Sequence, residues 1–170
     1  MKKVLGVGLM LFAVVSLAAF GGKRENILAR FNGAIGADPV SNVVVSATTG
    51  AVTVTPNAVR GVVPPGQIWR ISTLNANVFT DGHIVVHGRG LLLGGGNNIG
   101  TNAGQSVFAT LFCTASSSST NATGVALDED GNFTIDDVLS PLPQAPCDSP
   151  VLLIRTTGGT HPWFAAGIED

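Results

Sequence analysis

The sequence predicts an all-β fold, an antiparallel β-sandwich of about seven to nine strands. Short runs rich in valine, isoleucine, threonine and phenylalanine recur along the chain, and these residues favour strands. Turn-forming glycine, proline, asparagine and aspartate separate the runs at short intervals. Hardly any segment has the period of an amphipathic helix. Many short strands with frequent turns are typical of a sandwich.

The N-terminal segment has the layout of a secretory signal peptide, which we place at residues 1–21. Two lysines precede an apolar run over residues 4–20, and small residues follow it. This layout predicts cleavage after Ala18 or Gly21, or retention as an uncleaved anchor. A lipoprotein box would need a cysteine where Phe20 stands. We therefore exclude a lipid anchor and expect a secreted protein, extracellular or periplasmic.

Residues 22–42 are predicted to form a flexible spacer, followed by a single domain over residues 43–170. The spacer contains a brief apolar stripe at helical spacing, made by Ile27, Leu28, Phe31 and Ile35. Glycine and proline interrupt this stripe, so we expect at most one short helix.

The domain begins with two predicted hairpins. In the first, β-branched runs at 42–47 and 51–55 flank the turn 48–50. In the second, the runs 67–79 and 83–93 flank Asp81-Gly82, which is a strong hairpin signal.

A two-residue turn at Asp81-Gly82 would set the register of the second hairpin. It pairs Phe79 with Ile84 and Asn77 with Val86, and it places these four side chains on the core side. The opposite face, expected to be more exposed to water, would then carry Arg70, Val78, His83, His87, Arg89 and Leu91.

The rest of the chain alternates strands with polar loops. We expect a loop rich in glycine and asparagine at 94–106 and one rich in serine and threonine at 114–124. Four prolines keep residues 141–150 irregular. The remaining strands are predicted at 106–113, 125–128, 132–137, 151–156 and 163–168.

The charge balance excludes several kinds of partner. The whole chain has a formal net charge of −2, and after the predicted signal peptide seven basic residues face eleven acidic ones. Nucleic acid and anionic membrane surfaces both require clustered cations, so we expect neither as a partner. No lysine follows Lys23, which excludes Schiff-base chemistry in the domain.

The chain contains two cysteines, Cys113 and Cys147. In an exported protein such a pair is expected to form a disulfide. On the chain-entropy relation, closing this loop stabilises the fold by about 3–4 kcal/mol.

The segment 125–139 has the sequence VALDEDGNFTIDDVL, an acidic glycine turn between two apolar runs. Its pattern D-x-D-G-x-F-x-I resembles a hairpin of carboxypeptidase regulatory-like domains. The resemblance extends to residue 154. It implies a transthyretin-type, Ig-like sandwich with a binding or accessory role and without catalytic residues. The tyrosine motif that usually precedes the last strand of that family is missing, because the chain contains no tyrosine.

Two groups of side chains offer candidate metal ligands. His83 and His87 would lie roughly 13 Å apart on a strand, too far for one ion. An acidic cluster offers oxygen ligands to calcium through Asp128, Asp130, Asp136 and Asp137. The cluster lacks the order of an EF-hand loop, and a turn with solvated carboxylates explains the same residues. We therefore predict no metal and no other cofactor.

The glycine-rich loop 94–106 precedes no helix, so it does not fit a phosphate-binding loop. Asparagine and glycine supply adaptable hydrogen bonds, which favours a recognition loop. Its candidate contact residues are Asn97, Asn98, Thr101 and Asn102.

These observations predict a secreted, non-catalytic binding or accessory module that uses the loops 94–106 and 114–124 as its contact surface. No nucleophile motif is present, and the extracellular partner is unspecified. The alternative is a structural subunit of a surface or fibrous assembly, because valine-rich strands such as 43–45 can pair edge to edge. A third interpretation is an enzyme whose site is formed by residues that are far apart in the sequence. The sequence does not specify the oligomeric state.

Overall fold

The computed structural model describes residues 26–170 of the 170-residue chain. The predicted signal peptide lies outside the described residues. Within residues 26–170 there are thirteen β-strands and no helix, so the all-β prediction is confirmed. Accordingly, the described part of the chain contains no helix long and apolar enough to cross a membrane.

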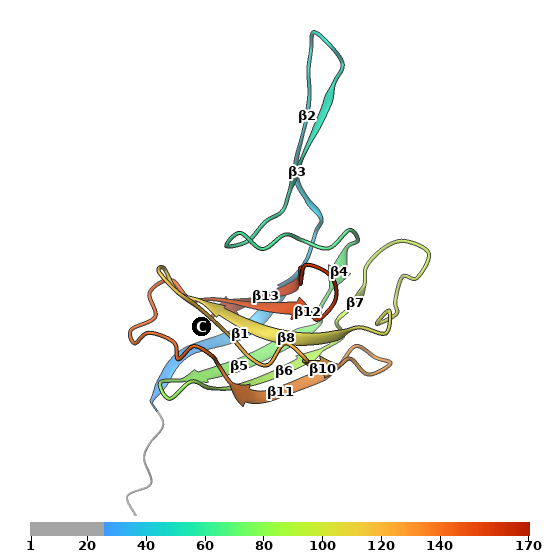
Figure 1. Ribbon diagram of the computed structural model, residues 1–170. Helices are drawn as coiled ribbons and strands as arrows, with labels where there is room; N and C mark the ends of the chain where they lie inside the picture. The colour runs from blue at the N-terminus through green and yellow to red at the C-terminus, as the bar shows by residue number, and fades with distance from the viewer. Residues whose placement is uncertain (1–25) are drawn as a thin grey trace, which may run out of the picture.

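One large antiparallel sheet forms the body of the protein and folds over into two layers (Figure 1). Its two edges meet after β11, where Ser119 and Ser140 exchange backbone hydrogen bonds of 3.0 and 2.8 Å. This layered arrangement confirms a sandwich-like fold. From edge to edge the strands are β10 (Val125–Ala126), β8 (Ser106–Phe112), β12 (Val151–Thr156), β13 (Trp163–Glu169), β1 (Ile27–Gly36), β5 (Thr73–Phe79), β6 (His83–Arg89) and β11 (Phe133–Val138), and β9 (Ser117–Ser119) pairs with β8.

The core lies between the two layers. A small ladder of β4 (Trp69–Arg70) and β7 (Leu92–Leu93) closes one end of it. There the rings of Trp69 and Phe164 stack with centroids 3.9 Å apart. The large side chains that are fully buried include Leu74, Val78, Ile84, Val86, Leu111, Leu152 and Ile154.

β1 occupies a central place in the sheet, between β13 and β5. The expectation of a spacer with at most one short helix is therefore wrong for residues 27–36. Ala29 and Phe31 point into the core. A register shift between Phe31 and Ala34 and a positive φ of 91° at Gly33 then break the alternation. This bulge leaves Ile35 63% exposed, and it hides the period of a strand.

The β5–β6 hairpin exists, but its register differs by one residue from the expected one. Val78, rather than Phe79, lies opposite Ile84. The connection is a three-residue loop that ends at Gly82, whose φ is 89°. Because a slip of one residue exchanges the two faces of a strand, Val78 is in the core and Asn77 is exposed. Leu91 is also fully buried, so its placement on the exposed face was wrong.

The segment 114–124 is not the single long loop that we expected. It contains β9, which pairs with β8, and it buries Ser118 and Thr120. The turn at 129–131 is present, but the strands on either side of it belong to different edges, since β10 pairs with β8 and β11 pairs with β6.

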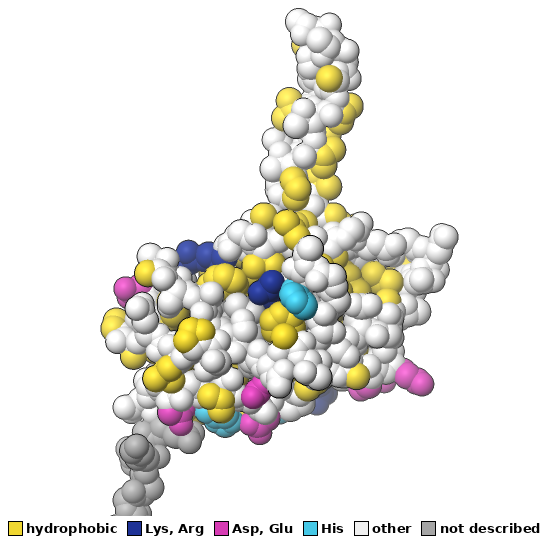
Figure 2. Space-filling model, viewed as in Figure 1, with side chains coloured by type: hydrophobic (Ala, Val, Ile, Leu, Met, Phe, Trp, Pro, Cys, Tyr) yellow, Lys and Arg dark blue, Asp and Glu magenta, His cyan; other side chains and the backbone are white. Residues whose placement is uncertain are grey.

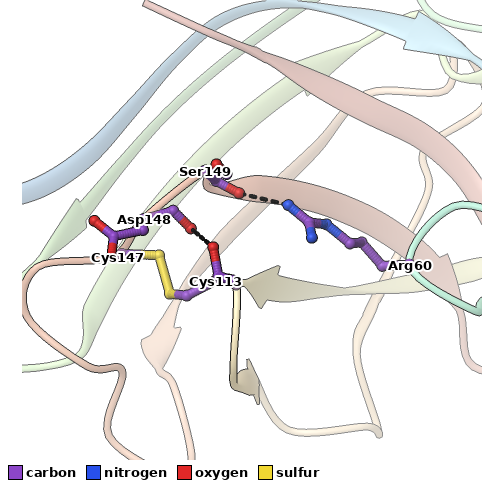
Figure 3. The surroundings of a disulfide bond; sticks show 6 residues. Arg60, Cys113, Cys147, Asp148 and Ser149 are labelled. Atoms are coloured by element: carbon purple, nitrogen blue, oxygen red, sulfur yellow. Dashed lines mark hydrogen bonds between the residues drawn. A yellow bond between two sulfur atoms is a disulfide. The ribbon is translucent and has the colours of Figure 1, made fainter.

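The disulfide between Cys113 and Cys147 is present, as the cysteine pair predicted. It ties the end of β8 to the proline-rich loop before β12 (Figure 3). In the same place Asp148 O accepts hydrogen bonds from the backbone N–H of Thr114 and from its Oγ1, at 2.9 and 3.0 Å.

The first predicted hairpin is confirmed, and it projects from the body (Figure 1). β2 (Val40–Val45) and β3 (Val52–Pro56) pair only with each other. We call residues 39–57 the arm. Its foot is attached to the body because Trp163 Nε1 donates a hydrogen bond of 3.0 Å to Asn57 O.

Candidate functional site

An open apolar hollow of about 370 Å³ lies between the segment that follows the arm, the 94–106 loop and the β12–β13 turn. We call it the apolar pocket. Hydrophobic atoms are visible in this region of the surface, between the body and the loop at the right of Figure 2. The walls are formed by Pro65, Trp69, Leu93, Pro162 and Phe164, and polar groups on the lining come from Gln67, Asn98, Gln105 and Thr156.

The pocket is built on hydrogen-bonded backbone. The N–H of Leu93 donates to Thr101 O at 2.9 Å, and the N–H of Gly100 donates back to Leu93 O at 2.8 Å. On the other side, Thr156 Oγ1 donates to Gln105 Oε1 at 2.7 Å. These bonds hold the loop against the body, so the hollow is formed before any ligand arrives.

The side chains that line the apolar pocket are uncharged among the described residues. Among the described residues, no aspartate, glutamate, histidine, cysteine, lysine or arginine lines it. The Thr156 hydroxyl already donates its proton to Gln105. The amides of Gln67 and Asn98 instead offer neutral hydrogen-bond donors and acceptors beside apolar walls.

The four predicted contact residues of the 94–106 loop have different places. Asn98 lines the apolar pocket, and Asn97 is exposed beside it. Thr101 Oγ1 donates to Asn98 O at 2.9 Å and so closes a local turn. Asn102 Nδ2 donates to Leu127 O and to Asp128 O, at 3.2 and 2.7 Å. Asn102 therefore ties the loop to the body.

The segment 114–124 contributes no residue to this pocket. The apolar pocket instead joins the 94–106 loop with residues 65–69 and with the β12–β13 turn. Sequence reasoning missed these last two segments, because they are far apart in the chain and their prolines indicate only turns.

The four acidic candidates are divided among separate contacts. Asp128 Oδ1 accepts the backbone N–H groups of Asp130 and Asn132 at 3.0 and 2.7 Å. The bond from the Asn132 backbone is the main cause that lowers the pKa of the Asp128 carboxyl. Asp137 accepts the N–H groups of Asn121 and Val138, at 2.9 and 2.7 Å.

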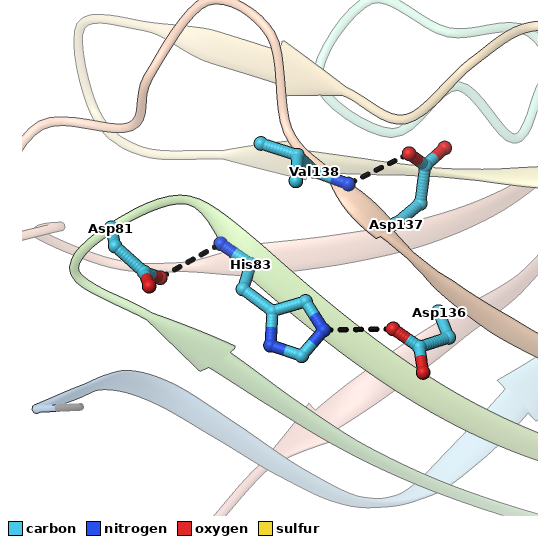
Figure 4. A network of polar contacts seen from close by, with 5 residues as sticks. All are labelled: Asp81, His83, Asp136, Asp137 and Val138. Atoms are coloured by element: carbon cyan, nitrogen blue, oxygen red, sulfur yellow. Dashed lines mark hydrogen bonds and ion pairs between the residues drawn. The ribbon is translucent and has the colours of Figure 1, made fainter. Parts of the chain in front are cut away.

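The remaining acidic candidate, Asp136, pairs with a histidine. Its Oδ1 lies 2.8 Å from His83 Nε2, and the N–H of His83 donates to Asp81 Oδ1 at 3.0 Å (Figure 4). His87 Nδ1 lies 3.2 Å from Thr134 Oγ1. Across residues 26–170, no three histidine, cysteine, aspartate or glutamate side chains are grouped so that they could hold a metal ion.

Arg155 forms a second polar feature, which sequence reasoning did not single out. Its guanidinium lies 5.3 Å from the centre of the Phe108 ring, and its Nε donates to His161 O at 2.9 Å. Burial lowers the pKa of Arg155. Of the acidic residues in the described part of the chain, none forms an ion pair with it. The only sequence signal for this feature is an arginine inside the apolar strand 151–156.

The backbone of His161 is in the left-handed region, with a φ of 56°. Its Nδ1 lies 3.1 Å from Thr156 O, and because a carbonyl oxygen only accepts, Nδ1 carries the proton. The ring meets Phe108 edge to face with centroids 5.4 Å apart. These contacts fix the β12–β13 turn, which forms one side of the apolar pocket.

No family model, curated protein or solved structure matches this chain. Function is therefore inferred from geometry and chemistry. The fold and the pocket define a class: an all-β, sandwich-like protein with a disulfide and an open apolar hollow.

Proposed function

We propose that the protein is a secreted, non-catalytic binding module whose apolar pocket takes an uncharged ligand. The observation that carries the proposal is the lining of the pocket. Aromatic and aliphatic walls stand beside neutral amides, and no titratable side chain lines the hollow in the described residues.

The chemistry of the lining limits the kind of ligand. A volume of about 370 Å³ lies at the small end of the range for ligand pockets. The walls favour an aromatic ring or a short aliphatic group, because their gain comes from removing apolar surface from water. A charged group would lose its hydration here without gaining a partner. The amides of Gln67 and Asn98 would orient the ligand through one or two hydrogen bonds.

The disulfide supports the compartment in this proposal. Disulfides persist in oxidising compartments and are rare in reducing ones. The Cys113–Cys147 bond therefore agrees with export by the predicted signal peptide, which lies outside the described residues.

A neutral fluorescent probe tests the pocket directly. N-phenyl-1-naphthylamine is uncharged and becomes fluorescent in apolar surroundings. We expect it to bind the wild-type protein saturably, with one site per chain. Gly66→Leu should weaken this binding about tenfold by occupying the pocket. Gly66 lines the pocket, and a Cβ added there meets no heavy atom within 4 Å, so the protein should still fold.

Gly95→Leu is the matched control. Gly95 does not line the pocket, and a Cβ there would meet only Ile68 Cδ1, at 3.9 Å. This variant should bind the probe as the wild type does. Absence of saturable binding, or an equal loss in both variants, would contradict the assignment of the pocket.

A further inference from the structure

The arm exposes apolar surface along its whole length. Every residue of β2 and β3 is exposed. Hydrophobic atoms line the arm in Figure 2, and no coloured charged side chain is visible on that face. The exposed valines are Val40 (42%), Val43 (54%), Val44 (52%), Val45 (61%), Val52 (61%) and Val54 (52%).

The register of the arm separates its two faces. Val43 lies opposite Val54, and Val45 lies opposite Val52. Side chains two residues apart on a strand share a face, so these four valines form one continuous apolar face. We call it the valine face. Val44 and its partner Thr53 belong to the opposite face, which is mixed.

An isolated two-stranded hairpin is marginally stable in water, because it has no layer to pack against. The valine face is such an uncovered layer. Exposed contiguous apolar surface on a soluble protein marks an interaction site. We therefore expect the valine face of the arm to be buried against a partner.

The distribution of charge indicates what covers the arm. Residues 39–59 contain no charged side chain. By contrast, residues 26–170 as a whole contain five arginines and ten acidic residues, a net charge of −5. Two bodies of this kind repel each other at close range. Two neutral arms that project from them do not, so the arm offers the place where two copies can meet.

Other occupants fit less well. Residues 39–59 contain no aromatic residue and no lysine or arginine, whereas segments that bind membrane interfaces carry both. A charged partner would find no complementary charge on the arm. An identical valine face matches in both size and neutrality.

We infer that two copies of this chain associate through their arms, with one valine face packed on the other. Such a contact is isologous, because the same surface is used by both copies. It therefore gives a dimer with two-fold symmetry and leaves no free valine face for a third copy. Two hairpin layers facing each other are expected to lie about 10 Å apart. The valine face has only four side chains, whereas a standard interface has about 20–30 residues on each side. The dimer is therefore weak and depends on protein concentration.

Sedimentation velocity over about 1 µM to 1 mM protein tests this inference. The sample is the protein as its expressing host produces it. We expect a reversible monomer–dimer equilibrium. Val45→Lys should raise the dissociation constant at least about tenfold, because it places like charges within the apolar contact.

Val44→Lys is the matched control. It adds the same charge to the adjacent residue of the same strand, but on the opposite face. Val44 and Val45 are similarly exposed, at 52% and 61%. We expect the dissociation constant of this control to stay within about twofold of the wild-type value.

A shortened arm gives an independent check. Replacing residues 43–54 by Asn-Gly leaves Asn42 and Thr55, which already pair, on either side of a two-residue turn. This variant should be monomeric and should still bind the neutral probe, because none of the removed residues lines the apolar pocket.

Four results would overturn the inference. The first is a wild-type protein that stays monomeric up to 1 mM. The second is an equal effect of Val44→Lys and Val45→Lys, and the third is a shortened variant that still dimerises. The fourth is the formation of species larger than a dimer, which would indicate open-ended pairing of strand edges in place of the closed valine contact.

Discussion

Removing the Cys113–Cys147 disulfide should lower the free energy of unfolding by about 4 kcal/mol. The bond joins residues separated by 34 positions. For a loop of this length, the chain-entropy relation gives about 12.6 cal/mol/K, or about 3.8 kcal/mol at 25 °C. The loss arises in the unfolded chain, which gains conformational freedom without the bond.

The folded state has other contacts that keep the two segments together. Thr114 donates two hydrogen bonds to Asp148 O, at 2.9 and 3.0 Å. Arg60 Nη2 donates to Ser149 O at 2.8 Å. The native fold should therefore persist without the disulfide, at lower stability.

The assay is urea denaturation of the wild type and of the double variant Cys113→Ala/Cys147→Ala. Alanine at both positions leaves no free thiol, and at the buried Cys113 it introduces no polar group. Reduced wild-type protein should unfold near the midpoint of the double variant. A loss below about 1 kcal/mol, or a double variant that is unfolded without urea, would refute the entropic explanation.

Two further predictions concern the turn before β11. Gly131→Ala should destabilise the protein by about 1–3 kcal/mol, because the added Cβ would lie 2.5 Å from Leu91 O and φ is 74°. Gly100→Ala has a similar φ of 81° but no neighbour within 4 Å, so in thermal denaturation it should lose clearly less, and equal losses would argue against the clash. The Asp128 carboxyl should titrate below the ordinary aspartate range, since hydrogen bonds from the Asn132 and Asp130 backbones favour its charged form. A pKa that is lower in the folded state gives stability that is present at pH values above the unfolded-state pKa and is lost as the pH falls through the folded-state pKa. Carboxyl NMR shifts of Asp128 followed between about pH 6 and pH 2 check this prediction. A titration midpoint in the ordinary aspartate range would contradict it.

Local patterns predicted the fold class because the strands are rich in β-branched and aromatic residues and most turns carry glycine, proline, asparagine or aspartate. The hairpin over residues 40–56, the strand at 106–112 and the final pair around 157–160 were identified for this reason. The disulfide followed from the presence of two cysteines.

The wrong predictions concern which face of a strand a side chain occupies, because a single extra residue exchanges the two faces along the rest of the strand. The bulge near Gly33 breaks the alternation of β1, so its apolar residues mimic a helical stripe. The loop that ends at Gly82 has three residues instead of two, and this exchanged the faces assigned to Asn77 and Val78. Neither insertion has a distinctive sequence signal.

The apolar pocket was only partly accessible to sequence reasoning. Asn98 was named because asparagine-rich loops often recognise ligands. Trp69 and Phe164, which form its walls, are nearly a hundred positions apart and look like ordinary core residues. Only the pairing of the strands brings them together.

The place of β1 in the sheet has a consequence for the order in which the protein matures. A chain is synthesised from its N-terminus, so β1 emerges before the other strands of the sheet. One neighbour in the sheet, β13 at residues 163–169, is made after all the other strands of the sheet. Until then one edge of β1 has no hydrogen-bonded partner strand, and the sheet is incomplete between β1 and β13. The two strands of the arm pair only with each other, so the valines of the arm are exposed before the body folds as well as afterwards. A nascent chain therefore exposes these valines before its core exists, and we expect aggregation to occur chiefly before β13 pairs with β1.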